Sequence, residues 1–423
     1  MKTCLFFASI IIAMYSADLG KQFLTIIAFL MGNPLGLVEY GRIVDIIFVI
    51  LVTFFTLAVL MFKKKSVRQF YNMPVALLVF LAMLMTISLM ESSDELSMEN
   101  YYRFLGGNLL LFLGVLVCGQ SPEAIKRIWN IWIFNSVILA TISSYLFLIG
   151  ITWSSGRSEL FPGTGIRSGY YCGLSVIYLA SKIILDSRHK LRHSFLRGGG
   201  ICIGILGVLL SGSKFSLFLV MASLIMMVFL KLLITKSMGR SSLLFMFSIF
   251  TLITILIFKV LVGFEMSGRD MGNLSNVYTT DSFQNSTYGR IDLSKHYFEL
   301  GMESPLIGHG ISAAYSLTER THSMLLSLFV QVGLLGVMAY LLFLVGILVP
   351  GFRRVRLSLL KSYINSDKSL ILSTFVAVMF FALKAEATGD VAANRELWFF
   401  AGMFLVLNGS SYNGLRVPLY RTR

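Results

Sequence analysis

Long, uninterrupted apolar blocks constrain the fold of this chain more than any other feature of its sequence. The blocks run for about 16 to 24 residues, the length at which a helix crosses a hydrocarbon core of about 30 Å. Hydrophobic residues make up 56% of the chain and charged residues 13%, whereas a soluble domain carries about 25% charged residues. Helices satisfy their own backbone hydrogen bonds inside lipid, and single strands do not. The sequence therefore predicts an all-α, polytopic integral membrane protein.

About twelve of these blocks are candidate transmembrane helices. They cover residues 4–20, 43–62, 72–90, 101–118, 128–150, 168–185, 198–213, 215–235, 241–262, 321–349, 369–384 and 394–410. The stretch 18–42 is ambiguous because Gly32-Asn33-Pro34 interrupts its apolar run. It is a kinked continuation of the first span, a re-entrant segment, or an extra span.

Basic residues gather in short loops that all fall on one side of the membrane if the predicted spans alternate. These loops contain Lys63, Lys64, Lys65, Arg68, Arg188, Lys190, Arg192, Arg197, Lys231, Lys236, Arg240, Arg353, Arg354, Arg356, Lys361, Lys368, Arg416, Arg421 and Arg423. Lys and Arg accumulate in cytoplasmic loops, so we expect both termini to be cytoplasmic. The same clustering accounts for the net charge of +15 without a nucleic-acid partner.

One predicted extracytoplasmic loop, residues 263–321, is much longer than the others. Its second half, Arg290–Gly301, is typical of a short amphipathic helix with an apolar side formed by Ile291, Leu293, Tyr297, Phe298 and Leu300. Loops of this length are usually functional. The loop divides the chain into residues 1–262 with about nine spans, residues 263–321, and residues 322–423 with about three spans and a basic tail.

An ordered set of short motifs begins in this loop. The motifs are Gly289-Arg290, Pro305-Leu306-Ile307-Gly308-His309-Gly310, Thr321-His322-Ser323 and Gly333-Leu334-Leu335-Gly336. Together with the number of spans and the long loop before the third-last helix, they resemble the O-antigen ligase/polymerase superfamily. These bacterial enzymes move lipid-linked oligosaccharides outside the cytoplasmic membrane. Ser211-Gly212-Ser213-Lys214 lies where the family often has Ser-Arg, and Lys214 keeps the charge of Arg but loses its bidentate fork.

The resemblance implies a metal-independent glycosyltransferase of the bacterial inner membrane that needs no cofactor. Its donor is a glycan on a polyprenyl diphosphate, and the diphosphate leaves with developing negative charge. Arg290, Lys214 and Arg167 are the expected diphosphate ligands. Arg290 is also expected to act in catalysis, with His322 as the base that activates a sugar hydroxyl. The sequence has no Asp-x-Asp motif and no His/Cys cluster with ligand spacing, so we expect no metal site.

Each of these residues also has a plainer interpretation. His322, near the start of a helix, is alternatively a capping or interfacial residue, and Arg290 is alternatively a solvated loop charge. Lys214 and Arg167 suit the role of interfacial anchors, whose charged ends reach toward water.

The last extracytoplasmic loop and its flanks contain five charged residues. These are Lys384, Glu386, Asp390, Arg395 and Glu396. They form either a polar cap on the two flanking spans or part of the reaction cavity. In the second case Asp390 or Glu386 orients His322 or an acceptor sugar.

The sequence favours a polysaccharide polymerase that extends a lipid-linked glycan. Its expected partners are polyprenyl-diphosphate-linked oligosaccharides, membrane lipids and a chain-length regulator protein. An O-antigen ligase, which delivers the finished chain to a lipid A core sugar, is the nearest alternative. A lipid-linked oligosaccharide transporter or flippase is an alternative of another class. It predicts acidic residues within the spans, and the predicted spans contain almost none.

Overall fold

The computed structural model describes most of the helical core of the chain. The described residues are 2–16, 40–62, 72–91, 95–119, 122–148, 165–185, 191–211, 213–235, 280–311, 313, 323–360, 368–388 and 394–410. All regular structure in these ranges is helical. Seven of the helices are long and apolar enough to cross a membrane, and three further apolar helices are shorter. The protein is therefore an all-α, multi-pass membrane protein, as predicted, while the total of twelve spans stays a prediction.

The helices follow the apolar blocks of the sequence. Their bounds are α1 Lys2–Ser16, α3 Tyr40–Phe62, α4 Met73–Glu91, α5 Glu95–Tyr102, the π-helix η2 Arg103–Leu109, α6 Leu110–Cys118, α7 Pro122–Leu148, α8 Gly165–Leu185, α9 Leu191–Leu210, α10 Lys214–Thr235, α13 Thr280–Glu303, α14 Met324–Leu360, α15 Lys368–Thr388 and α16 Arg395–Ser410. Every predicted span coincides with a helix except 241–262, which lies outside the described residues. Most of the ambiguous stretch 18–42 also lies outside them.

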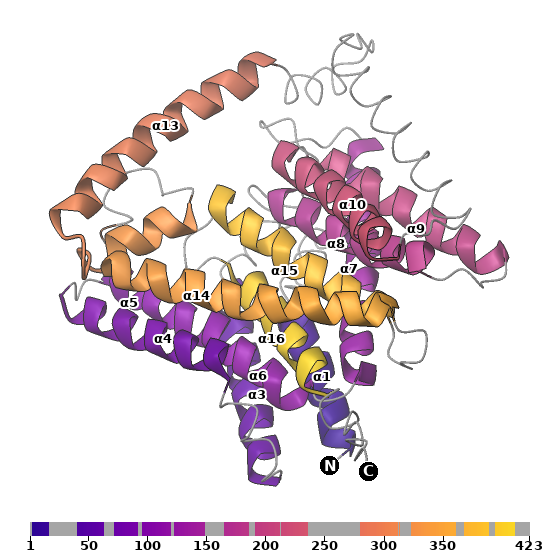
Figure 1. Cartoon of the computed structure of the whole chain (residues 1–423), viewed down its shortest axis with the longest axis horizontal. Coiled ribbons are helices and arrows are strands. Elements are labelled where there is room, and N and C mark those ends of the chain that lie inside the picture. Colours follow the sequence, from indigo (N-terminus) through magenta and orange to yellow (C-terminus); the bar gives the residue numbers. More distant parts are fainter. Residues whose placement is uncertain are drawn as a thin grey trace, which may run out of the picture.

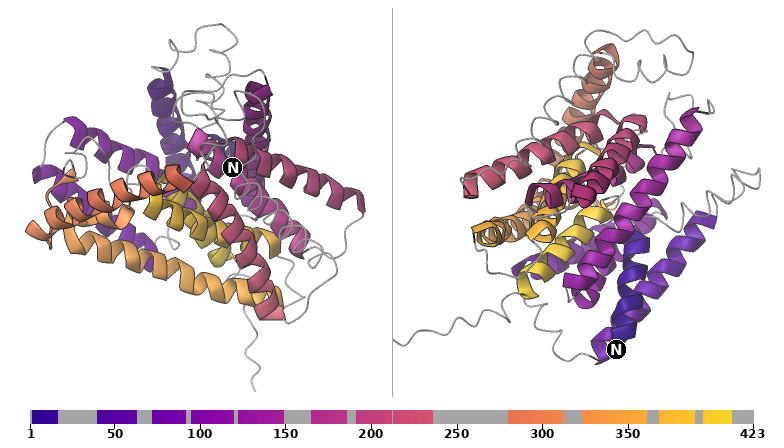
Figure 2. Two further views of the ribbon diagram at one scale, coloured as in Figure 1. Left: turned by 90° about the horizontal axis from the view of Figure 1, so that it is seen from above. Right: turned by 90° about the vertical axis from the view of Figure 1, so that its right-hand side faces the viewer.

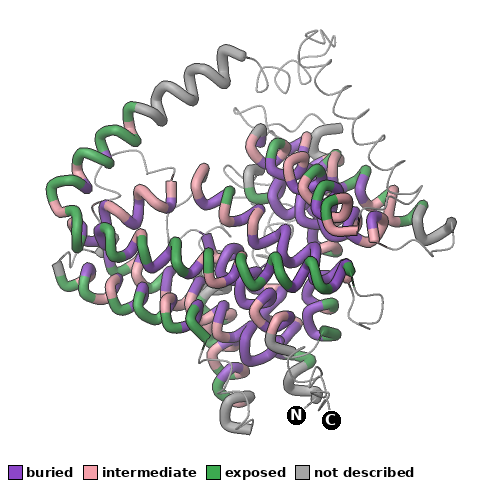
Figure 3. Tube along the Cα trace, in the orientation of Figure 1, coloured by how far each residue is buried: buried purple, intermediate pink, exposed green. Residues whose placement is uncertain are grey.

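Two helices form the centre of the bundle. Within their candidate spans, 78% of α8 and 72% of α15 is buried, against 33% of α4. α15 packs against α8, α10, α14 and α16, and α8 packs against α7 and α9 as well. α4 lies along α14 at the periphery of the bundle (Figures 1 and 2). Figure 3 shows the same arrangement: buried segments fill the interior, and exposed segments follow the outer sides of α4, α13 and α14.

Small residues allow the central helices to approach closely. A Cβ atom on Gly207 of α9 would lie 2.6 Å from Cys172 Sγ, and one on Gly173 of α8 would lie 2.5 Å from Val220 Cγ2. Such contacts are typical of helix packing in membranes, where van der Waals complementarity replaces the hydrophobic effect. The glycines therefore place α8 directly against α9 and α10.

α14 is broken at Gly333, so the predicted span 321–349 is not one regular helix. Gly333 has φ +69° and ψ −166°, and a Cβ on Gly336 would lie 3.8 Å from Leu328 Cδ2, eight residues earlier. Figure 1 shows the short N-terminal segment of α14 folding back over the long segment that follows. A left-handed φ is favourable for glycine and costly for other residues. The helix also continues to Leu360, well beyond the predicted end.

The Pro305–Gly310 turn closes the break by backbone hydrogen bonds. The N–H of Leu334 donates to Pro305 O at 2.8 Å, and the N–H of His309 donates to Val330 O at 2.8 Å. A Cβ on Gly308 would lie 2.5 Å from the backbone carbon of Gln331. We call this arrangement of the turn and the helix break the glycine interlock; it comprises Gly308, Gly310, Gly333 and their backbone partners. It gives two of the sequence motifs a structural role.

The predicted amphipathic helix exists and is longer than expected, because α13 spans Thr280–Glu303. Tyr297 is fully buried and Phe298 is 54% exposed. The ring of Phe298 lies 5.9 Å from that of Phe329 on α14. The C-terminal end of α13 meets α14, and its N-terminal part diverges from α14 (Figure 1).

Candidate functional site

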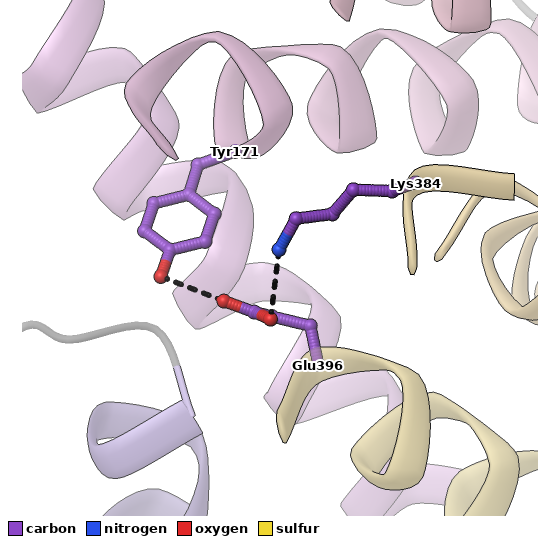
Figure 4. A network of polar contacts seen from close by, with 3 residues as sticks. All are labelled: Tyr171, Lys384 and Glu396. Carbon is purple, nitrogen blue, oxygen red and sulfur yellow. Dashed lines mark hydrogen bonds and ion pairs between the residues drawn. The ribbon is translucent and has the colours of Figure 1, made fainter. Parts of the chain in front are cut away.

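A buried ion pair joins the end of α15 to the start of α16. Lys384 Nζ lies 3.1 Å from Glu396 Oε2, and the two residues are 6% and 2% exposed. The hydroxyl of Tyr171 on α8 donates to Glu396 Oε1 at 3.2 Å. Figure 4 shows the two side chains of α15 and α16 meeting beneath α8. A charge buried inside a helical bundle is costly unless it is paired. Lys384 and Glu396 therefore each require the other as a counterion.

Aromatic rings surround the cations of this region. Lys384 Nζ lies 5.0 Å from the ring centroid of Tyr170. The guanidinium of Arg395, the first residue of α16, lies 5.1 Å from the ring centroid of Tyr15. Aromatic faces attract cations through their quadrupole. The rings therefore stabilise positive charge at this end of the bundle.

Arg167 belongs to the same region. It is exposed, lies in the first turn of α8, and precedes Tyr170 by three residues. Its charge and that of Arg395 act on both Lys384 and Glu396. The charges of three basic residues thus act on one carboxylate, and we call Arg167, Lys384, Arg395, Glu396 and Tyr171 the cationic cluster. The predicted diphosphate ligand Arg167 lies within it.

Lys214 starts α10 beside the first turn of α8. A Cβ on Gly169 would lie 2.4 Å from Ser211 Oγ and 3.0 Å from Ser216 Oγ. Ser213 caps α10, because its Oγ accepts the N–H of Ser216 at 3.2 Å. The structure therefore brings the backbone of Lys214 to the turn of α8 that carries Arg167. The side chain of Lys214 lies outside the described part of the structure.

Glu386 faces α14 rather than the ion pair. Its Oε2 accepts the hydroxyl of Ser323 at 2.9 Å and the N–H of Leu325 at 3.3 Å. Ser323 Oγ in turn accepts the N–H of Leu326 at 3.3 Å. Glu386 thus caps the N-terminus of a neighbouring helix, a position that favours negative charge. It also holds the residue that directly follows His322.

For three predicted site residues the structure describes the backbone alone or nothing. His322 and Asp390 lie outside the described residues. The backbone of Arg290 lies in α13, about two turns before Phe298, and its side chain is not among those described. The contacts of α13 on α14 involve Gly301 and Phe298, so the described contacts do not join Arg290 to the cationic cluster.

Sequence reasoning named Lys384, Arg395 and Glu396 as loop charges and missed their pairing. The usable signal was a Lys inside an apolar span and a Glu at the start of the next one, because such charges are rare within membranes unless paired. Tyr171 carried no such signal. Within the described ranges, no group of three or more His, Cys, Asp or Glu residues could hold a metal ion.

Comparison with known proteins adds no relative. No protein-family model matches the sequence, and no curated protein matches it significantly. The resemblance to the O-antigen ligase/polymerase superfamily therefore rests on the motifs and their order.

Proposed function

We propose that this protein is a polysaccharide polymerase that works at the extracytoplasmic face of the bacterial inner membrane. It transfers a growing glycan from polyprenyl diphosphate to a sugar hydroxyl of the next lipid-linked repeat unit. The observation that carries the proposal is the excess of positive charge in the cationic cluster, where Arg167 and Arg395 act on the Lys384–Glu396 pair. Positive charge in this number suits an anionic substrate group.

The diphosphate is the part of the substrate that suits the cationic cluster. α8, α10 and α16 begin in this region, and helix N-termini carry partial positive charge. Guanidinium groups bind phosphate oxygens by paired, charge-assisted hydrogen bonds. Arg167 is exposed, so its guanidinium is accessible to a ligand. Arg167 and Arg395 therefore bind the diphosphate, with Lys214 and Arg290 as the further ligands that the motifs predict.

The reaction is a single displacement without a metal ion. His322 accepts the proton of the acceptor hydroxyl, whose oxygen forms the new bond to the anomeric carbon. The bond from that carbon to the diphosphate breaks, and the diphosphate leaves with the bonding electron pair. The cations stabilise its growing negative charge. Attack opposite the leaving group inverts the anomeric configuration.

The test uses a clean deletion strain and a gel of its surface polysaccharide. Wild-type protein restores the polymer ladder, whereas Arg167→Gln and Arg395→Gln fail to restore it at equal membrane abundance. Arg356→Gln is the matched control, because Arg356 is an exposed Arg near the far end of α14. Normal ladders from both site variants contradict the assignment of the diphosphate site.

The deletion strain also separates the polymerase from the alternative functions. Core carrying one repeat unit indicates loss of a polymerase. Bare core with polymer left on its carrier lipid indicates loss of a ligase. An unchanged ladder contradicts both enzymatic functions and favours a transporter or another surface polysaccharide.

A further inference from the structure

α15 and α16 present different chemistry to α8 and to α14. Residues two apart on a helix point in directions about 200° apart. Lys384 and Glu396 face Tyr171 of α8. Two residues further along each helix, Glu386 binds the start of α14 and Trp398 contacts the ring of Tyr340 on α14. The α14 side is therefore a second polar surface, separate from the cationic cluster.

Three buried polar atoms on this second surface lack a hydrogen-bond partner among the described residues. They are the Tyr340 hydroxyl, Trp398 Nε1 and Glu386 Oε1. Tyr340 and Trp398 are both 0% exposed. Unpaired buried polar atoms are costly, and native proteins contain few of them. A group of three therefore requires an explanation.

Trp398 differs from Trp129 and Trp132, the other two buried tryptophans of the described structure, in its hydrogen bonding. Trp129 Nε1 donates to Thr374 Oγ1 at 3.0 Å, and Trp132 Nε1 donates to Ser16 Oγ at 3.0 Å. The fold thus supplies partners for buried indole N–H groups where they serve packing. Trp398 Nε1 has no such partner among the described residues.

Two of the three groups belong to neighbouring rings. The ring centroids of Tyr340 and Trp398 are 6.2 Å apart, and their planes are at 62°. Glu386 contacts the start of the helix that carries Tyr340, through the Ser323 hydroxyl and the N–H of Leu325. Phe343 and Phe104 flank the indole at centroid distances of 5.0 Å and 6.2 Å. The surface thus combines a carboxylate acceptor, an indole donor and a phenol, which both donates and accepts, beside apolar rings.

We propose that the side of α15 and α16 that faces α14 binds the acceptor sugar through Glu386, Tyr340 and Trp398. Neighbouring sugar hydroxyls supply donors and acceptors at short spacing, which matches these three groups, and the sugar's C–H faces suit the aromatic walls. This inference rests on the proposed polymerase function. It places the acceptor beside Ser323, the residue that follows the predicted base His322, while the diphosphate binds on the α8 side. Since the three atoms are covered here, binding requires α14 to separate locally from α15 and α16.

The experiment measures sugar binding by the full-length protein in phospholipid nanodiscs. The probe is the free oligosaccharide that mild acid releases from the lipid-linked repeat unit accumulated by the deletion strain. We expect Tyr340→Phe to bind this oligosaccharide about tenfold more weakly than wild type. Tyr178→Phe is the matched control, because Tyr178 is a buried tyrosine on α8 whose ring stacks on Trp129, and it keeps wild-type affinity.

Thermal unfolding without the sugar provides an independent readout. Removing a buried hydroxyl that has no partner raises the unfolding midpoint, so Tyr340→Phe becomes more stable while it binds more weakly. A lower midpoint shows that the hydroxyl has a structural partner, and equal affinities of wild type and Tyr340→Phe show that it does not contact the sugar. Either result overturns the acceptor site and leaves the polymerase function intact. A deletion strain that accumulates no lipid-linked oligosaccharide instead overturns the proposed function, and the acceptor site with it.

Discussion

The cationic cluster and the glycine interlock hold helices together through different kinds of atoms. The cluster is made of side chains, and its centre is the 3.1 Å contact between Lys384 and Glu396. The interlock is made of backbone atoms, with Leu334 N–H donating to Pro305 O at 2.8 Å. The cluster therefore depends on charge, and the interlock depends on the absence of a Cβ atom. Each region is sensitive to a different class of substitution.

Removal of one charge from the cluster has the largest expected effect. Glu396→Ala leaves Lys384 buried without its counterion, which costs about 3–5 kcal/mol in comparable sites. We expect the variant to unfold at markedly lower denaturant than wild type in mixed micelles. The double variant Lys384→Met/Glu396→Gln removes both charges and recovers most of the stability. Equal instability of the single and double variants would contradict an ion pair.

The interlock is broken by one methyl group. A Cβ on Gly333 would lie 2.2 Å from Leu306 O, and φ +69° is unfavourable for any other residue. Backbone strain and the clash together cost about 2–4 kcal/mol, so Gly333→Ala lowers the unfolding free energy measured in mixed micelles.

Gly198→Ala is the matched control for Gly333→Ala. A Cβ at this helical position of α9 meets nothing within 4 Å, and alanine is the better helix former by about 1 kcal/mol. The control is therefore at least as stable as wild type. Equal stability of both alanine variants contradicts the interlock.

The helices could be predicted well because lipid sets their length and composition. The prediction 72–90 corresponds to α4, Met73–Glu91, with one residue of difference at each end. The errors arise where a helix leaves the apolar region. α7 begins at Pro122 instead of 128, and α14 continues through Arg353, Arg354 and Arg356 to Leu360. Charged residues end a hydropathy signal without ending a helix.

The candidate site could be predicted only in part, because pairing depends on packing. The expected diphosphate ligand Arg167 carries one of the charges that act on Glu396. The motifs gave no means of matching Lys384 with Glu396 or with Tyr171, which is more than two hundred residues away along the chain and on another helix. The glycine motifs indicated a function by resemblance, whereas the structure shows that they close the break in α14.

A smaller effect is expected from loss of the hydrogen bond between Tyr171 and Glu396. Tyr171→Phe keeps the ring, whose centroid lies 4.9 Å from that of Trp132, and removes the hydroxyl that donates to Glu396 Oε1. A hydrogen bond to a charged group contributes about 1.5–3 kcal/mol. We expect a loss near the lower limit, because the ion pair with Lys384 remains. Unfolding in mixed micelles measures it, and a loss as large as that of Glu396→Ala would show that the ion pair itself had broken.

The smallest effect is expected at Ser323, which binds Glu386 of α15 at the start of α14. Ser323→Ala removes a hydroxyl that donates to Glu386 Oε2 and accepts the N–H of Leu326. Loss of a helix cap costs about 1 kcal/mol, and the bond from Leu325 N–H to Glu386 limits the damage. The unfolding free energy of the purified protein measures this cost.

Double variants then show to which region Ser323 belongs. Distant and independent sites add within about 0.5 kcal/mol. Ser323 directly precedes the short segment of α14 that ends at Gly333, whereas Lys384 and Glu396 belong to α15 and α16. We therefore expect Ser323→Ala to be non-additive with Gly333→Ala and additive with Glu396→Ala. The reverse pattern would mean that Glu386 couples the start of α14 to the ion pair, and the two regions would then act as a single unit.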